Sequence, residues 1–407
     1  MHILFLSGWF PYPQDNGSKI RIFNLLKGLS ARHRVTLLTF SDSTELGGAV
    51  GELDSVCDRV NVIPKNDFRP TSPKAILGAF SPTPRSLVDT FSQEMARAIS
   101  ENLRNGCDMV IASEATFLPY SQILRDRPAL LEDIELASVY DRYVNSSSIR
   151  RVRHMLTWLK TKQYVSRQLS AFRACTVVSE RERIILRRAA PAVGSVEVVP
   201  NCIDFGRYAG KQSEAEPNSL IFTGSPTYSA NYDAVSFFLD DILPIVKKEC
   251  PQVRLKVTGK YEGVDLAPGF GGDGVELLGY VPDVRPLIAG SQVSIVPLRQ
   301  GGGTRLKILE AMALGTPVVS TSKGAEGLDV THGENILIAD RPSDFAGCVL
   351  ELLSDSDLRA KLGENGRELV RAKYNWESVM PRFLDLVERV AASSEATLDL
   401  KPAIKTV

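Results

Sequence analysis

One stretch of the chain, residues 293–319, has the pattern of a strand, a glycine loop, a helix and a second strand. Its first six residues (VSIVPL) are an apolar run typical of a buried strand. The glycines at 301–303 then allow a sharp turn and a close approach of the backbone to a ligand. Thr304 is a candidate N-cap, and Gly315 ends the predicted helix before the strand at 318–319. This order of elements is the setting in which a helix N-terminus binds phosphate.

Two cations lie at the start of this predicted helix. Arg305 and Lys307 fall in its first turn, where the helix dipole disfavours positive charge by roughly 0.3–1 kcal/mol and a bound anion would reverse the effect. Glu310 follows Lys307 by one turn in an otherwise apolar helix. The two side chains can form an exposed ion pair, or they can belong to a phosphate and sugar site. The glycine loop favours the second interpretation.

Length and composition narrow the class of protein. A chain of 407 residues is too long for one ordinary core, so we expect two domains. A net charge of zero argues against a general nucleic-acid binder, and six scattered cysteines without a C-x-x-C pair suit a reducing cytoplasm. We find no signal-peptide pattern and no run near the ~20 apolar residues of a membrane span. We therefore expect a folded, soluble, cytoplasmic protein.

The first half of the chain alternates predicted strands with predicted helices. We expect strands at 3–6, 35–40, 60–63, 109–112, 176–178 and 196–199, and helices at 18–31, 89–103, 146–172 and 180–189. This alternation predicts a doubly wound parallel sheet of the α/β class, with ligands beyond the carboxyl ends of the strands. Ser7–Gly8 and Ser113–Glu114 would then lie near a ligand cleft.

A second alternating set follows a polar segment, KQSEAEPN at 211–218. We expect strands at 220–222, 254–258, 275–278, 293–298, 318–319 and 336–338, with helices at 234–249, from 283, from 342 and at 376–390. The predicted organisation is an N-terminal domain at 1–205, a linker at 206–218, a second domain at 219–375, a C-terminal helix at 376–393 and a disordered tail at 394–407.

Several motifs together resemble one family of enzymes. They are VPNCID at 199–204, GYVPD at 279–283, KILEAM at 307–312 and GTPVV at 315–319, with PYP at 11–13, Gly17, Arg21 and HRVT at 33–36 matching one branch. The chain resembles the retaining, nucleotide-sugar-dependent glycosyltransferases of GT-B architecture, the group 1 class. The resemblance covers nearly the whole chain.

The resemblance implies two Rossmann-like domains facing a cleft, with the donor on the second domain, the acceptor on the first, and the last helix crossing back to the first. It also implies that Glu310 hydrogen-bonds the donor ribose, that Arg305 and Lys307 lie near the diphosphate, and that the backbone of Tyr280 and Val281 borders the base. Transfer would be metal-independent, with no metal ligands and no cofactor besides the nucleotide-sugar co-substrate. Front-face departure and attack would retain the anomeric configuration.

The chain departs from this family at two places. The family places a glutamate about two helical turns before Glu310, but Gly302 stands at that position. The Arg and Lys that many members carry after the first strand of the second domain are absent from residues 224–231 (GSPTYSAN). Arg305 and Lys307 can compensate for the missing cations. The motifs do not identify the residues that contact the sugar.

The candidate site residues follow from the motifs and from strand ends. The predicted donor-binding residues are Gly17, Ser18, Gly224, Tyr280, Val281, Gly301, Gly302, Gly303, Thr304, Arg305, Lys307 and Glu310. The predicted catalytic residues are Arg305, Lys307 and Glu114, the last of which would orient the acceptor hydroxyl.

Several other polar residues are weaker candidates for a functional role. An acidic run, Glu132, Asp133 and Glu135, either lines the acceptor side or is only surface, and Glu326 follows a strand end in the second half. Asn201 and Asp204 are expected to shape the domain junction. The four histidines show no ligand spacing, so we expect structural or surface roles for His2, His33, His154 and His332.

These residues predict a glycosyltransferase that moves a sugar from a nucleoside-diphosphate sugar to a glycan or lipid-linked acceptor in cell-surface polysaccharide or glycoconjugate synthesis. Two alternatives remain open: a nucleotide-sugar 2-epimerase of the same architecture, and a non-catalytic protein that binds a nucleotide sugar. Acceptor dependence and turnover distinguish the three.

The predicted helix at 146–172 suggests a further partner, an anionic membrane at its inner face. Its cations and apolar residues are Arg150, Arg151, Arg153, Lys160, Lys162 and Arg167, with Met155, Leu156, Trp158 and Leu159. A basic helix with Trp and Leu is typical of a helix that lies in a membrane interface. The alternative is an ordinary helix with its apolar face in the core and its basic face in water.

Overall fold

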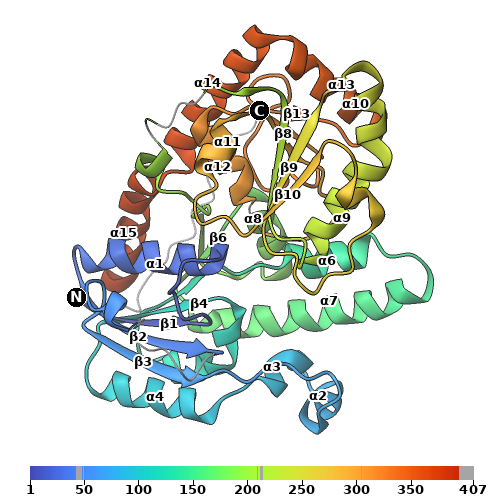
Figure 1. Cartoon of the computed structure of the whole chain (residues 1–407). Coiled ribbons are helices and arrows are strands. Elements are labelled where there is room, and N and C mark those ends of the chain that lie inside the picture. Colours follow the sequence, from blue (N-terminus) through green and yellow to red (C-terminus); the bar gives the residue numbers. More distant parts are fainter. Residues whose placement is uncertain (43–47, 49, 209, 211–213, 304, 394–407) are drawn as a thin grey trace, which may run out of the picture. The chain divides into compact units, whose positions relative to one another are not determined.

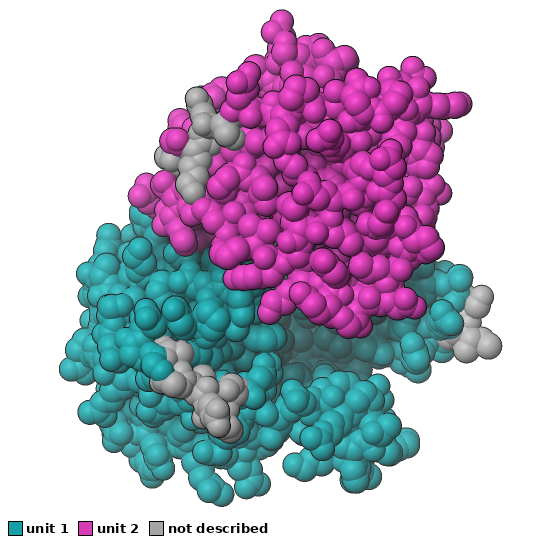
Figure 2. Space-filling model, in the orientation of Figure 1, with its two compact units in different colours: residues 1–199, 380–407 teal, residues 200–379 magenta. Residues whose placement is uncertain are grey.

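The computed structural model describes residues 1–42, 48, 50–208, 210, 214–303 and 305–393. The chain divides into two compact units, unit 1 with residues 1–199 and 380–407 and unit 2 with residues 200–379 (Figure 2). Each unit is built on its own parallel sheet, and each is described by itself below. No helix in the described part of the chain is both long and apolar enough to cross a membrane.

Unit 1 contains a seven-stranded parallel sheet in the order β3-β2-β1-β4-β5-β6-β7 (Figure 1). The strands are β1 His2–Ser7, β2 Arg34–Ser41, β3 Arg59–Pro64, β4 Met109–Ser113, β5 Ala129–Glu132, β6 Ala174–Val177 and β7 Ser195–Val198. The central strands β1 and β4 are almost wholly buried, because helices cover both faces of such a sheet. The strand order reverses between β1 and β4, which makes the carboxyl ends of these two strands the place where a doubly wound sheet binds ligands.

The helices of unit 1 cover its sheet. They are α1 Gly17–Ser30, α2 Pro73–Gly78, α3 Arg85–Asp89, α4 Gln93–Arg104, α5 Ser121–Leu124, α6 Ala137–Val144, α7 Ser148–Gln168 and α8 Glu180–Ala189. Sequence periodicity predicted one helix at 89–103, but α4 begins only at Gln93. Asp89 instead ends α3, and its carboxylate accepts hydrogen bonds from the Arg69 amide and the Ser72 hydroxyl.

Unit 2 is also built on a parallel sheet, with six strands in the order β10-β9-β8-β11-β12-β13. The strands are β8 Glu216–Thr223, β9 Arg254–Thr258, β10 Val275–Gly279, β11 Ser291–Val296, β12 Val318–Ser320 and β13 Leu337–Ile338. The helices are α9 Ser229–Phe237, α10 Leu243–Glu249, α11 Arg285–Ala289, α12 Leu306–Leu314, α13 Pro342–Ser354 and α14 Ser356–Lys373. The prediction of two doubly wound α/β units is therefore confirmed.

One predicted helix of unit 2 is interrupted. In place of a continuous helix at 234–249, α9 begins at Ser229 and is joined to α10 by a π-helical turn, Phe238–Ile242. In this turn the Leu243 amide donates to the Phe238 carbonyl, five residues earlier. Pro244 follows directly and has no amide hydrogen to donate, so the helix widens where its regular hydrogen bonds fail.

The junction between the units lies earlier than the sequence predicts. The division falls between Val199 and Pro200, whereas the predicted linker spans 206–218. Much of that segment is part of unit 2, because Phe205–Tyr208 form a 3₁₀ turn and Glu216 already begins β8.

The last helix, α15 Trp376–Ala392, contains the second division between the units, after Val379. Within unit 1 it buries Phe383, Leu386 and Val387. The Arg389 guanidinium also pairs with the Glu197 carboxylate at 2.5 Å. The predicted disordered tail at 394–407 lies outside the described residues.

Candidate active site

The glycine loop joins β11 to α12 in unit 2. Gly301 and Gly303 have φ angles of 97° and 79°, a region that favours glycine. The helix begins at Leu306, so Arg305 occupies the N-cap position, and its side chain makes no capping bond. Thr304, the predicted N-cap, lies outside the described residues. Gly315 ends the helix with a φ of 79°, as its sequence position predicts.

Arg305 has a different place from the one that the helix pattern predicts. It precedes the helix, so only Lys307 falls in the first turn. Its side chain is buried, and its Nη1 donates to the Gly302 carbonyl oxygen at 2.5 Å. Arg305 therefore anchors the glycine loop in addition to bringing positive charge to the helix N-terminus.

Lys307 is half-buried, and its side chain points toward the first turn of α9. Its Nζ donates to the Asn231 side-chain oxygen at 3.0 Å and lies 4.0 Å from the centroid of the Phe222 ring. Burial lowers the pKa of Lys307 to about 7, with a further contribution from the Arg305 charge. Gly224 leaves the space for this ammonium, since a Cβ at position 224 would lie 2.7 Å from the Lys307 Nζ.

Glu310 does not pair with Lys307, which removes the interpretation of the two as an exposed ion pair. One of its carboxylate oxygens accepts the Tyr208 hydroxyl at 3.0 Å, and burial raises the pKa of Glu310. The Arg285 guanidinium lies 6.0 Å from the centroid of the Tyr208 ring. Sequence reasoning missed Tyr208, which is 102 residues from Glu310 and belongs to no motif.

The other predicted residues of unit 2 follow the carboxyl ends of its strands. Tyr280 comes directly after β10, is 65% exposed, and has the Lys260 Nζ 5.5 Å from its ring centroid. Val281 follows it in the same loop. Glu326 comes after β12 and pairs with Lys323, so an ion pair within its own loop holds it. Asn201 and Asp204 lie at the start of unit 2, before the turn that carries Tyr208.

These strand ends meet at one edge of the sheet because all the strands are parallel. The order reverses between β8 and β11, so residues 224–228, which join β8 to α9, and the glycine loop flank the topological switch point. Structure thus brings Gly224, Lys307 and the glycine loop together, and places Glu310 one helical turn further along α12. No group of three or more metal-binding side chains occurs in the part of the chain that the structure describes.

Unit 1 presents a second polar cluster at the carboxyl edge of its own sheet. Glu114 follows β4 with a φ of 73°, a strained conformation for a residue other than glycine. A Cβ at Gly8, after β1, would lie 2.6 Å from a Glu114 carboxylate oxygen. Burial raises the pKa of Glu114 to about 8, and the carboxylates of Asp133 and Glu132 add to the shift. Strain and a raised pKa at a switch point mark Glu114 as a candidate functional residue.

The acidic run after β5 divides into buried and exposed members. Glu132 is fully buried, accepts the Arg21 Nε at 2.7 Å and the Ser113 hydroxyl at 2.9 Å, and so has a structural role. Asp133 is partly exposed with a φ of 52°, and Glu135 is exposed. The expectation that one of the three lines the acceptor side therefore narrows to Asp133 and Glu135.

Gly17 and Ser18 are the first two residues of α1, as predicted. Asn16 caps this helix, its side-chain oxygen accepting the Lys19 amide at 3.0 Å. Sequence reasoning missed this cap. The amides of Gly17 and Ser18 precede Lys19 at the positive end of the helix dipole, a position suited to an anion.

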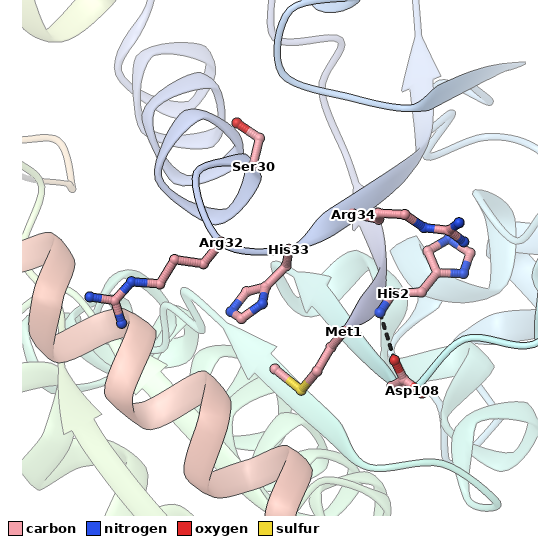
Figure 3. Close-up of a pocket in the computed structure, with 7 residues that line it drawn as sticks. All are labelled: Met1, His2, Ser30, Arg32, His33, Arg34 and Asp108. Atoms are coloured by element: carbon pink, nitrogen blue, oxygen red, sulfur yellow. Dashed lines mark hydrogen bonds between the residues drawn. The ribbon is translucent and has the colours of Figure 1, made fainter.

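Figure 3 shows a pocket at the opposite edge of the same sheet. It is lined by Met1, His2, Ser30, Arg32, His33, Arg34 and Asp108. His2, Arg34 and Asp108 lie at the amino ends of β1, β2 and β4, away from Glu114. His2 and His33 have structural settings, since the His2 amide donates to Asp108 at 2.6 Å and His33 is buried near Glu388. This pocket is therefore separate from the candidate site.

Comparison with known proteins finds a family match within unit 2. Residues 217–355 match the family described as glycosyl transferases group 1. The glycine loop, Arg305, Lys307 and Glu310 all fall inside this matched range.

Curated relatives are similar over part of their length. The chain is 31% identical over 144 residues to the lipopolysaccharide core biosynthesis glycosyltransferase LpsE of Rhizobium meliloti, covering 34% of this chain and 42% of that protein. It is 28% identical over 227 residues to a GDP-mannose-dependent monoacylated alpha-(1-6)-phosphatidylinositol monomannoside mannosyltransferase of Corynebacterium glutamicum, covering 50% and 59%. The match thus spans less than two thirds of either relative.

Solved structures agree with the whole chain in fold. Sucrose-phosphate synthase of Thermosynechococcus elongatus superposes with a TM-score of 0.70 at 19% identity, covering 97% of this chain and all of that one. Anabaena HepE in complex with UDP and glucose gives a TM-score of 0.61 at 15% identity, covering 95% and 99%. The fold is that of GT-B glycosyltransferases.

Proposed function

We propose that the protein is a glycosyltransferase that moves a sugar from a nucleoside-diphosphate sugar to a glycan or lipid-linked acceptor, with retention of the anomeric configuration. The observation that carries this proposal is Lys307, a half-buried ammonium in the first turn of α12, beside the glycine loop and inside the matched family domain. A diphosphate at this helix N-terminus would receive charge from Lys307 and Arg305 and hydrogen bonds from backbone amides.

These groups also explain how transfer would be accelerated. The departing nucleoside diphosphate gains negative charge as the glycosidic bond breaks, so cations fixed at its position stabilise the transition state more than the ground state. Glu310 would accept a hydrogen bond from the donor ribose. Glu114 of unit 1, with a pKa near 8, would orient the acceptor hydroxyl.

The proposed process is the synthesis of a cell-surface polysaccharide or glycolipid. Support comes from the names of the relatives, one a lipopolysaccharide core glycosyltransferase and one a mannosyltransferase of a phosphatidylinositol mannoside. Retention is supported by the resemblance of the motifs to the retaining class.

A thermal-shift screen against UDP, GDP, dTDP and ADP sugars tests donor binding. A sugar nucleotide present at about 100 times its Kd should stabilise the folded protein by roughly 2.7 kcal/mol. The donor identified in this way is then incubated with glycan and lipid-linked acceptors, and the anomeric configuration of the product is read by NMR. We expect transfer to persist in EDTA, since the cations of unit 2 would neutralise the leaving group.

Each alternative has its own outcome in these assays. Conversion of the donor sugar without any acceptor would replace the proposal with a 2-epimerase. Binding without turnover under every condition would replace it with a nucleotide-sugar-binding protein. Transfer abolished by EDTA and restored by Mg²⁺ or Mn²⁺ would show that a metal site is required.

A further inference from the structure

Two segments of unit 1 expose apolar side chains next to one another. On α2 and just after it, Ile76, Leu77 and Phe80 are 54%, 71% and 89% exposed. On α7, Val152, Leu156 and Leu159 are 55%, 59% and 50% exposed. The Lys160 Nζ joins the segments by donating to the Gly78 carbonyl at 2.8 Å. We call these six apolar residues and the cations around them the α2–α7 face.

The exposed residues of α7 form one stripe. At about 100° per residue, Val152, Leu156 and Leu159 fall within about 60° of one another around the helix axis. Trp158 points elsewhere: it is buried, with its ring 5.1 Å from that of Tyr140. The sequence interpretation that placed Trp158 among the interfacial residues is therefore wrong, and Val152 takes its place on the stripe.

Cations flank this stripe on both sides. By the same helical geometry, Arg153, Lys160 and Arg167 lie on one side of it, and Arg151 and Lys162 on the other. An apolar stripe between two rows of cations is the arrangement of a helix that lies in a membrane interface, with its cations at the level of the lipid headgroups.

Charge on the α2–α7 face is of one sign. Residues 68–88 and 148–168 together contain nine Lys and Arg and no Asp or Glu, while the whole chain has a net charge of zero. The remainder of the chain therefore carries a net charge of −9. This separation of charge attracts one face to an anionic surface and repels the rest.

α2 and its following residues are placed to enter such a surface. In Figure 1, α2 and α3 lie apart from the strands of unit 1, on the α7 side, and in Figure 2 they form a separate lobe of this unit. Leu77 and Phe80 are the two most exposed large apolar side chains among the described residues. Ile76, Leu77 and Phe80, three large apolar residues within five positions, are absent from the buried core of unit 1.

We propose that the α2–α7 face docks on an anionic lipid bilayer, with Leu77 and Phe80 inserted among the lipids and the cations of α7 on the headgroups. This inference rests on the proposed function only for its purpose, which is to bring unit 1 to a lipid-linked acceptor. The docking itself requires no donor and no turnover.

Co-sedimentation of the full chain with vesicles tests the proposal. Vesicles of equimolar phosphatidylglycerol and phosphatidylcholine should bind the protein at low ionic strength, and phosphatidylcholine alone should bind it weakly. Leu77→Ser with Phe80→Ser should lower the partition coefficient by about tenfold or more at low salt, because both side chains then lose their apolar contact. Arg151→Glu with Arg153→Glu and Arg167→Glu should lower it by at least as much, and salt should weaken wild-type binding.

Matched controls lie elsewhere on the surface. Ile184→Ser with Ile245→Ser removes two exposed apolar residues outside the α2–α7 face, and Lys248→Glu with Arg254→Glu and Lys361→Glu reverses three exposed cations of unit 2. Both controls should bind vesicles as the wild type does. Circular dichroism and melting temperature confirm that each variant is folded.

Three results would overturn the proposal: no binding of the wild type to anionic vesicles, equal losses in the variants and their controls, or unchanged binding by the Leu77/Phe80 variant. Light scattering tests whether a second copy of the chain, rather than a membrane, covers the α2–α7 face. A wild-type dimer that becomes monomeric in the Leu77/Phe80 variant, without vesicle binding, would assign the face to a second copy of the chain. Nucleotide-sugar thermal shifts of the same variants keep the two proposals apart, since failure to bind any donor leaves the vesicle result unaffected.

Discussion

The lowered pKa of Lys307 predicts that donor binding depends on pH. Burial lowers the pKa of Lys307 to about 7, so its amine is largely uncharged above neutrality in the empty site, and a bound diphosphate would favour its protonated form. Affinity for the donor nucleotide should therefore fall as the pH rises from about 7 to about 9, with uptake of a proton on binding. Titration calorimetry in buffers of different ionisation enthalpy measures both effects.

The lowered pKa of Lys307 also makes the free energy of unfolding depend on pH. Between the folded pKa of about 7 and the higher unfolded pKa, the unfolded chain binds more protons, so this contribution to the free energy of unfolding increases with pH. Lys307→Arg keeps a charge throughout the range and should remove the pH dependence of binding. A wild-type affinity that stays constant over this range would show that the lysine does not contact the diphosphate.

Substitution of Glu310 tests the proposed hydrogen bond to the donor ribose. Glu310→Gln should raise the donor Kd by about ten- to hundredfold, the value of a hydrogen bond of roughly 1.5–3 kcal/mol to a charged group. Tyr208→Phe is the matched control, because it removes only the hydroxyl that Glu310 accepts at 3.0 Å. It should weaken binding less than Glu310→Gln does. Equal losses would assign Glu310 a structural role, and wild-type turnover in Glu310→Gln would remove it from the site.

At the scale of elements, α12 is positioned by its contact with α14. A Cβ at Gly363 would lie 2.3 Å from the Gly315 carbonyl oxygen, a backbone atom that cannot move without shifting the end of α12. Gly363→Ala should therefore lower the free energy of unfolding by roughly 1–3 kcal/mol, measured by urea denaturation. Gly347→Ala in α13 is the control, since nothing lies within 4 Å of its added Cβ, and it should gain about 0.5–1 kcal/mol. A Gly363→Ala protein as stable as this control would contradict the close packing of the two helices.

Elements with strong periodicity could be predicted, and those fixed by distant contacts could not. The apolar runs of β1, β4 and β9 and the spacing of α8 predict these elements to within one residue, because burial on both faces writes a local pattern. The short helices α2 and α3 lie among prolines and glycines and left no such pattern. Similarly, the glycine loop and Lys307 were predicted from local sequence, whereas the Tyr208–Glu310 and Asn231–Lys307 contacts depend on the folding of unit 2.

At the scale of the molecule, unit 1 is not contiguous in the sequence. Its N-terminal 199 residues are completed by α15 from Met380 onward, after all of unit 2 has intervened. A Cβ at Gly28 of α1 would lie 2.1 Å from the Met380 sulfur, so the returning helix packs closely on α1. Unit 1 is therefore completed by a segment that follows all of unit 2 in the chain.

Substitution of Phe383 measures how much α15 contributes to the stability of unit 1. Its side chain is fully buried in unit 1, and truncation to alanine leaves a cavity that the surrounding strands and helices cannot fill. Phe383→Ala should lower the stability of unit 1 by about 3–5 kcal/mol, whereas Arg382→Ala, at an exposed position one residue earlier, should change it by less than about 0.5 kcal/mol. Scanning calorimetry measures both. Lys307 and Glu310 belong to unit 2. A donor nucleotide added below the melting temperature of the Phe383 variant should therefore still bind and raise that melting temperature. Equal melting temperatures for the two variants would show that the returning helix is not needed to complete unit 1.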